Sequence, residues 1–187
     1  MSELIDMAMQ EGSSAMSDAI DHLKAELLKV RTGKASTGIV KDLLVDYYGN
    51  PTPLSQVANL GTPDSKTISI QAWEKSLMPI IEQAIFAANL GLTPMNDGEF
   101  IRISIPPMTE ERRIEMVKRA KSLGEEAKVS LRNSRQKIMQ TIKDEVKDGF
   151  PEDAGKHSEA KVESIVKGFV DNIGKLVDAK EIDIMKV

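Results

Sequence analysis

The chain has 187 residues, of which 41% are hydrophobic and 29% are charged, so it can form one ordinary domain or two small ones around a hydrophobic core. It contains no cysteine, which excludes disulfides, thiolate metal sites and a thiol nucleophile. The formal net charge of -4 argues against a polyanionic partner only if the charges are spread evenly along the chain.

The N-terminal segment MSELIDMAMQ carries early acidic residues and no long apolar run, which is not the pattern of a signal peptide. No stretch approaches the roughly 20 apolar residues that span a bilayer. We therefore expect a cytoplasmic protein without a membrane partner.

The first predicted element is a helix over residues 16–30. Its apolar side chains alternate in steps of four and three, which is typical of a helix in a bundle or coiled coil; they are Met16, Ile20, Leu23, Leu27 and Val30. The pattern ends at Arg31-Thr32-Gly33, where glycine favours a helix end.

The segment VRTGKAS that follows contains a glycine and a lysine, but it does not form a phosphate-binding loop of the P-loop type. Leu28 stands where that loop has its first glycine, and Ala35 follows Lys34 where it has a serine or threonine. A helix also precedes the segment, where a strand would be needed. This pattern therefore gives no support for a nucleotide-hydrolysing enzyme.

The period changes to two between about residues 35 and 105. We predict strands in KDLLVDYYG, SKTISIQAW and EFIRISIP, separated by the turn signals GNPTP, GTPDS and MNDGE. One amphipathic helix starts from Ser76, which is expected near its N-cap, has Pro79 in its first turn and stops at Gly91. The aromatic residues Tyr47, Tyr48 and Trp73 lie in these strand patterns, where core or cross-strand packing is the expected role.

The helical period returns after Pro106-Pro107, with Thr109 as the expected cap of a second long helix that runs to about Val146. The seam of this helix is formed by Met116, Ala120, Leu123, Ala127, Leu131, Ser134 and Ile138. GFPEDAG then breaks the chain. A third helix follows, with an apolar seam at Val162, Val166, Phe169, Ile173 and Leu176.

These elements predict an α+β protein: a long three-helix bundle (residues 1–31 and 107–187) with an inserted small β/α/β domain (residues 32–106). Two short connections join the insert to the bundle, around Arg31–Gly33 and around Ile105–Met108. The residues alone leave open whether these connections form a hinge or a fixed junction.

One segment of the chain is strongly basic. Between Arg112 and Lys137 there are nine basic and three acidic residues, a local net charge of +6. At 100° per residue, Lys128, Arg132 and Arg135 fall within about 40° of Lys121 on the second long helix. This stripe predicts a phosphate-binding surface, and a solvated helix face is the alternative.

Catalytic groups are scarce in the sequence. His22 is expected on the flank of the bundle and His157 in a loop, and neither has a neighbour at metal-ligand spacing. We expect no enzyme activity, no cofactor and no metal. Arg31 and Arg132 are expected about 35 Å apart at 1.5 Å per residue, so an extended basic surface for a large folded RNA is favoured over a small anion.

Five segments, in this order and spacing, resemble the bacterial ribosome recycling factor family: KVRTGKAS, VDYYGNPTPLSQVANL, ANLGLTP, PPMTEERR and EEAKVSLRNSRQ. The resemblance spans nearly the whole chain. It implies an L-shaped two-domain molecule, a translation factor that binds the post-termination 70S ribosome through large-subunit rRNA, and dissociation of the subunits with elongation factor G and GTP. We expect the factor to be a monomer and to have no chemistry of its own.

The resemblance also implies roles for particular residues. Arg31, Lys34, Arg132 and Arg135 match basic positions that contact RNA in the family, and Lys121 and Lys128 share the stripe of the last two. The junction residues Thr32, Gly33, Ile105, Pro106 and Pro107 match the family's hinges. Lys34 stands where arginine is usual, and Gln136 where a second arginine is common, so some bidentate phosphate contacts would be weaker.

Two other functional classes stay open at this point. One is a coiled-coil interaction protein whose basic stripe is only solvated, which predicts little dependence of binding on salt or RNA. The other is a small phosphate-handling enzyme, which predicts nucleotide turnover by the isolated chain.

Overall fold

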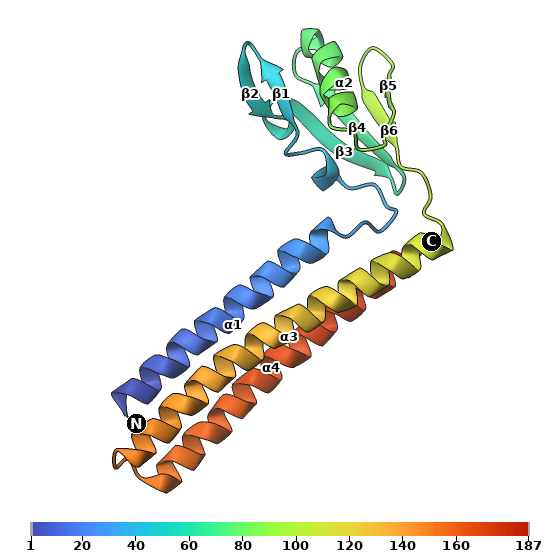
Figure 1. The fold of residues 1–187 in the computed structure, drawn as a ribbon. Coiled ribbons are helices and arrows are strands. Elements are labelled where there is room, and N and C mark those ends of the chain that lie inside the picture. The colour runs from blue at the N-terminus through green and yellow to red at the C-terminus, as the bar shows by residue number, and fades with distance from the viewer. Residues whose placement is uncertain (1, 187) are drawn as a thin grey trace. The chain divides into compact units, whose positions relative to one another are not determined.

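The computed structural model describes residues 2–186, which form two compact units. The boundaries between the units fall after Thr32 and after Thr109. Unit 1 consists of the helices α1 (Glu3–Lys29), α3 (Glu110–Lys147) and α4 (Glu152–Met185), and Figure 1 shows them side by side. Unit 2 contains all six strands and the short helix α2 (Met78–Ala87). The predicted α+β class, a three-helix bundle with an inserted β/α/β domain, is confirmed.

The core of unit 1 is formed by the apolar seams that the helical period predicts. Met16, Ile20, Leu23 and Leu27 of α1 are buried against Leu123, Ala127 and Leu131 of α3 and against Val162 and Ile173 of α4. The expected stop signal between α3 and α4 is also present, since Gly149 has a φ of 106°, a left-handed conformation that favours glycine.

The start of α1 differs from the prediction. The helix begins at Glu3, not near residue 16, and buries Ile5 completely. The small residues at 12–14 interrupt the apolar period and hid this part of the helix. Gly12 has a packing role: a Cβ atom there would collide with Ile138 Cδ1, so any larger residue would force the Ile138 side chain of α3 to move.

α4 also starts earlier than its apolar seam indicates. It begins at Glu152, so His157 lies in a helix and is exposed there, and its predicted place in a loop was wrong. The cause is the polar first turns of α4, where acidic residues favour a helix N-terminus without contributing to an apolar pattern.

The strands of unit 2 form two antiparallel sheets. β1 (Leu44–Tyr47) pairs with β2 (Asn50–Pro53), and a four-stranded sheet has the order β3-β4-β6-β5, with β3 Ala58–Asp64, β4 Thr67–Ala72, β6 Ile101–Ser104 and β5 Pro94–Asn96. The isoleucines of β4 and β6 are completely buried and share one core with Ile81 and Ile85 of α2; they are Ile68, Ile70, Ile101 and Ile103.

Several local details of unit 2 differ from the prediction. GTPDS is mostly strand and not turn, since Gly61–Asp64 lies in β3. GNPTP is not only a turn, because Asn50–Pro53 is a strand; its prolines are tolerated since β2 pairs with β1 alone and has a free edge. Ser76, expected near the N-cap of α2, directly precedes it: Ser76 lies inside a 3-10 turn, Lys75–Leu77, and Leu77 takes the N-cap position. Tyr48 and Trp73 are not in the core, since 75% and 63% of their surfaces are exposed, but Trp73 does contact the neighbouring strand, because its ring N–H donates to Asn59 of β3.

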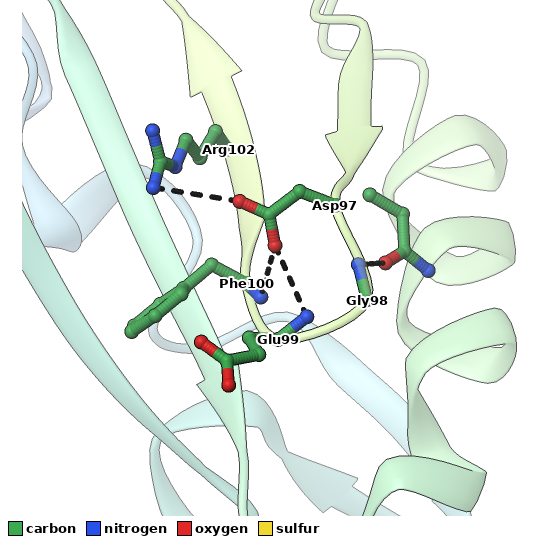
Figure 2. Close-up of polar contacts among 6 residues, drawn as sticks. Asp97, Gly98, Glu99, Phe100 and Arg102 are labelled. Atoms are coloured by element: carbon green, nitrogen blue, oxygen red, sulfur yellow. Dashed lines mark hydrogen bonds and ion pairs between the residues drawn. The ribbon is translucent and has the colours of Figure 1, made fainter.

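The turn between β5 and β6 shows how the predicted signal MNDGE works (Figure 2). Asp97 accepts hydrogen bonds from the backbone N–H groups of Phe100 (2.8 Å) and Glu99 (3.0 Å), and it forms an ion pair with Arg102 at 3.4 Å. The bonds from Phe100 and Glu99, with the charge of Arg102, hold the pKa of Asp97 below its usual value. The carboxylate thus closes the turn locally.

Close helix packing at Gly124 leads to a stability prediction. A Cβ atom there would lie 2.7 Å from Val177 Cγ2, whereas nothing lies within 4 Å of a Cβ added at Gly168 on α4. We expect Gly124→Ala to destabilise the bundle by about 1–3 kcal/mol through overpacking. The matched change Gly168→Ala should stabilise it by up to about 1 kcal/mol. Urea unfolding followed by helical circular dichroism measures both, and equal effects of the two changes would contradict this account of the packing.

Candidate nucleic-acid interface

The predicted basic stripe lies on the middle of α3, where the apolar seam of the helix fixes its orientation. Leu123, Ala127 and Leu131 are buried, which leaves Lys121 and Arg132 exposed and Lys128 and Arg135 half-buried. A charged head on a half-buried stem can remain in water while its methylene groups cover apolar surface.

Three of the four cations of the stripe already have an acidic partner. Lys121 pairs with Glu181 at 3.3 Å, Lys128 with Glu125 at 3.0 Å, and the guanidinium of Arg135 with Glu163. The hydrogen bonds that Arg135 donates to Glu163 raise the pKa of Arg135 and lower the pKa of Glu163. Two of these acids, Glu163 and Glu181, lie on α4, so the stripe borders that helix.

Glu163 and Glu181 are residues that sequence reasoning missed. The angular positions of side chains on α3 could be calculated from the sequence, but the register between α3 and α4 could not. Acidic residues on α4 were the only available signal, and many of them are there.

Arg132 differs from its three neighbours on the stripe. Within residues 2–186 its exposed guanidinium has no ion pair and no hydrogen bond. A guanidinium presents a planar set of donors that matches two phosphate oxygens at once. Among the stripe residues Arg132 is therefore the one that can bind a phosphate without first breaking a contact within the chain.

Arg31 lies beyond the end of α1, whose C-cap is Val30, and its side chain is exposed. The helix ends at Lys29, within one residue of the predicted end at residue 30. The contact of Gly12 with Ile138 sets the antiparallel register, in which Arg31 is level with about Arg119 of α3. Arg31 and Arg132 are then about 20 Å apart along the bundle, not 35 Å. They still cannot share one small-anion pocket.

The predicted junction residues are divided between the two units. Thr32 belongs to unit 1, whereas Gly33, Lys34 and the segment Ile105–Pro107 belong to unit 2. Ile105 is only 8% exposed and its N–H donates to Lys66 O at 2.7 Å, so it is fixed in the core of unit 2. Lys34 is half-buried and also makes a polar or electrostatic contact.

Both connections are held by the same β-turn in unit 2. Ala35 N–H donates to Ser65 O at 2.8 Å, next to the Ile105 bond to Lys66. Gly33 has a φ of 75°, and a Cβ atom there would lie 3.3 Å from the side chain of Met108. Only a few residues lie between these anchors and the helices of unit 1, around Arg31–Gly33 and Pro106–Thr109.

Other features of the described residues do not form a catalytic constellation. His22 lines a groove of about 150 Å³ between α1 and α3, on the bundle flank where it was predicted, together with Glu26, Glu126 and Ser130. Between Ser2 and Lys186 no group of three or more histidine, aspartate or glutamate side chains is placed to hold a metal ion. In the same part of the chain, no helix has the length and hydropathy needed to span a membrane.

Comparison with known proteins links this arrangement to one family. The family model described as ribosome recycling factor matches residues 23–185. Proteins named ribosome-recycling factor are similar over nearly all of the chain: that of Flavobacterium psychrophilum is 44% identical over 100% of both chains, and that of Geobacter metallireducens is 47% identical over 92% of this chain and 94% of its own.

Two solved structures are similar to this one. The solution structure of a ribosome recycling factor has a TM-score of 0.80 and 35% identity, with complete coverage of both chains. The second has a TM-score of 0.65 and 34% identity over 97% of this chain and 98% of the other. It is described as models for the T. thermophilus ribosome recycling factor and the E. coli elongation factor G bound to the E. coli post-termination complex.

Proposed function

Since this chain belongs to the ribosome recycling factor family, we propose that it binds the post-termination ribosome and, together with elongation factor G and GTP, drives the subunits apart. The observation that carries the proposal is the 44% identity to a named recycling factor over the full length of both chains. The second similar structure, in which a relative and elongation factor G are bound to the post-termination complex, supports the same partners here.

Unit 1 supplies the contact with large-subunit rRNA in this proposal. Phosphate contacts position a protein on RNA without reading its sequence, and a long rigid helix with Arg132 and Arg135 exposed or half-exposed suits that task. Arg31, Lys121 and Lys128 extend the contact within unit 1, and Lys34 at the start of unit 2 adds to it. The cations paired with α4 must exchange a carboxylate for a phosphate, which reduces their net contribution.

Unit 2 receives the push from elongation factor G. Thr32 and Gly33 on one connection and Pro106 and Pro107 on the other form the hinge, and Ile105 anchors it in unit 2. Movement at this double junction passes force to the contacts between the subunits. The chain acts as a cytoplasmic monomer and performs no nucleotide hydrolysis; the GTP is hydrolysed by its partner.

Light scattering of purified 70S post-termination complexes tests this function. The scattered intensity should fall only when this chain, elongation factor G and GTP are all present. Omission of this chain should prevent the fall, and the chain alone should release no phosphate from GTP. Subunit separation that does not depend on this chain would contradict the proposal.

The pairing of Arg135 with Glu163 gives a further prediction. Glu163→Gln should raise the affinity for 70S ribosomes about two- to threefold, because Arg135 no longer has to leave a charged partner. Asp171→Asn removes the same charge from an exposed position on α4 and should change affinity less. Co-sedimentation at fixed salt measures both; an equal gain would mean that only the overall charge matters.

A further inference from the structure

Unit 2 has a pocket that the proposed RNA contact does not use. Its volume is about 220 Å³. The buried residues Val57 and Leu77 line it together with Tyr47, Trp73 and Glu74, and Thr52 and Gln56 complete its wall. The pocket therefore combines apolar surface, aromatic rings and one carboxylate.

Trp73, one of the aromatic residues at this pocket, has most of its surface exposed to solvent. Trp73 is 63% exposed, and its ring N–H donates to Asn59 Oδ1 at 3.1 Å, which holds the indole in place. Large aromatic side chains gain most when they are buried, so an indole held in an exposed position suggests a contact with another molecule.

Tyr48 gives an independent indication. It forms the two-residue turn between β1 and β2 with Gly49, and both residues have positive φ, 50° and 84°. Such turns favour Asn-Gly, since a bulky side chain is strained in the left-handed region. The tyrosine ring is nevertheless kept there, 75% exposed, and strain of this kind concentrates at functional sites.

Glu74 joins these aromatic groups. It accepts hydrogen bonds from Tyr48 Oη at 2.8 Å and from Tyr47 Oη at 3.3 Å, and the two rings pack edge to face with centroids 4.8 Å apart. A carboxylate has about four acceptor positions, so the two tyrosines leave capacity for further donors. Its charge also raises the pKa of Tyr48, after the larger effect of their hydrogen bond.

A carboxylate among aromatic rings is complementary to a cation. An arginine side chain can stack its plane on the rings of Trp73 or Tyr47 and donate to Glu74 at the same time. A phosphate would be repelled by Glu74. The described part of unit 2 as a whole has five basic and seven acidic residues between Gly33 and Thr109, so it does not offer RNA the basic surface that α3 does.

We propose that this pocket takes an arginine side chain presented by a protein of the post-termination complex, and that unit 2 thereby docks on protein while unit 1 docks on RNA. This inference rests on the proposed function, because that function supplies the complex in which the partner is met. It adds the chemistry of the partner and the residues that recognise it.

Photo-crosslinking tests the proposal. Gln56 is exposed and lines the pocket without contributing a ring or a charge, so Gln56→p-benzoylphenylalanine places a probe there. The full chain is bound to purified post-termination ribosomes with elongation factor G and a non-hydrolysable GTP analogue, then irradiated. We expect a crosslink to a protein, within a few residues of an arginine.

Two variants, each of which removes one negative charge, are made in the chain that carries the photo-crosslinker. They distinguish binding of an arginine by Glu74 from mere closeness of a protein to the pocket. Glu74→Gln should lower the crosslink yield about tenfold, because a charge-assisted contact is lost. Glu99→Gln, an exposed change in the same unit, should leave the yield unaltered. The chain has a single tryptophan, so unchanged Trp73 emission shows that the pocket is intact in the Glu74→Gln variant.

The other outcomes overturn the proposal in different ways. A crosslink to rRNA would show that the aromatic groups stack on bases, and a yield insensitive to Glu74→Gln would exclude cation recognition. No crosslink from a chain that still co-sediments with ribosomes would refute the pocket but not the proposed function. A chain that does not co-sediment at all would refute both.

Discussion

A disulfide between the two connections is expected to abolish subunit splitting while ribosome binding persists. A Cβ atom at Gly33 would lie 3.6 Å from Met108 Cβ, within the range of natural disulfides, and the chain has no cysteine of its own. The bridged Gly33→Cys, Met108→Cys variant leaves only a few free residues between the bridge and the ends of α1 and α3. If movement at the junction transmits the push, the splitting rate should fall at least about tenfold.

The redox state of the variant supplies the control. Reduction should restore splitting to the level of the two single variants, which carry any cost of placing a side chain at the left-handed Gly33. Affinity for 70S ribosomes should change by less than about threefold between the oxidised and reduced forms. Equal loss of binding and splitting on oxidation would show that the junction does not act as a hinge.

Removal of both arginines from the stripe has the second large expected effect. Arg132→Ala alone should weaken 70S binding about tenfold or more, because hydrogen bonds from charged groups to phosphate contribute about 1.5–3 kcal/mol. Arg132→Ala, Arg135→Ala should weaken it further, by less than the same factor again, since Arg135 already has Glu163 as a partner. Filter binding or co-sedimentation at fixed salt measures the affinities.

Lys175→Ala on α4 is the matched control for this series. It also removes an exposed cation from a long helix of unit 1, but it lies about 120° round α4 from Glu163 and Glu181, which face the stripe, and should change affinity less than about threefold. If Lys175→Ala and Arg132→Ala have the same effect, the stripe is a solvated face and the RNA contact lies elsewhere.

The helices of unit 1 could be predicted from the sequence wherever an apolar residue recurs with the helical period. Met16 to Leu27 on α1 and Leu123 to Ile138 on α3 are buried as that period requires. The prediction failed where α1 packs on another helix through a small residue, because such a residue does not add to the apolar period. Gly12 reads as a helix breaker in the sequence, but it is the residue that lets α1 pack directly on Ile138.

The candidate site could be predicted only in part for the same reason. The angular positions of Lys121 and Arg132 on α3 follow from helix geometry, but their neighbours on α4 depend on a register that no single helix encodes. Glu181 and Glu163 therefore came only from the structure. The exposure of Tyr48 was also hidden, because strand-like composition does not show that a residue lies in the turn itself.

The measurement that tests the central claim most directly is the salt dependence of binding to purified 70S ribosomes, compared between the natural chain and Arg132→Ala, Arg135→Ala. If unit 1 binds rRNA phosphates through α3, the logarithm of the association constant should fall steeply with the logarithm of salt concentration, and the slope should become shallower by about one for each phosphate contact removed. A slope that is the same in both proteins would contradict phosphate binding by the stripe, and the absence of ribosome binding would contradict the proposed function itself.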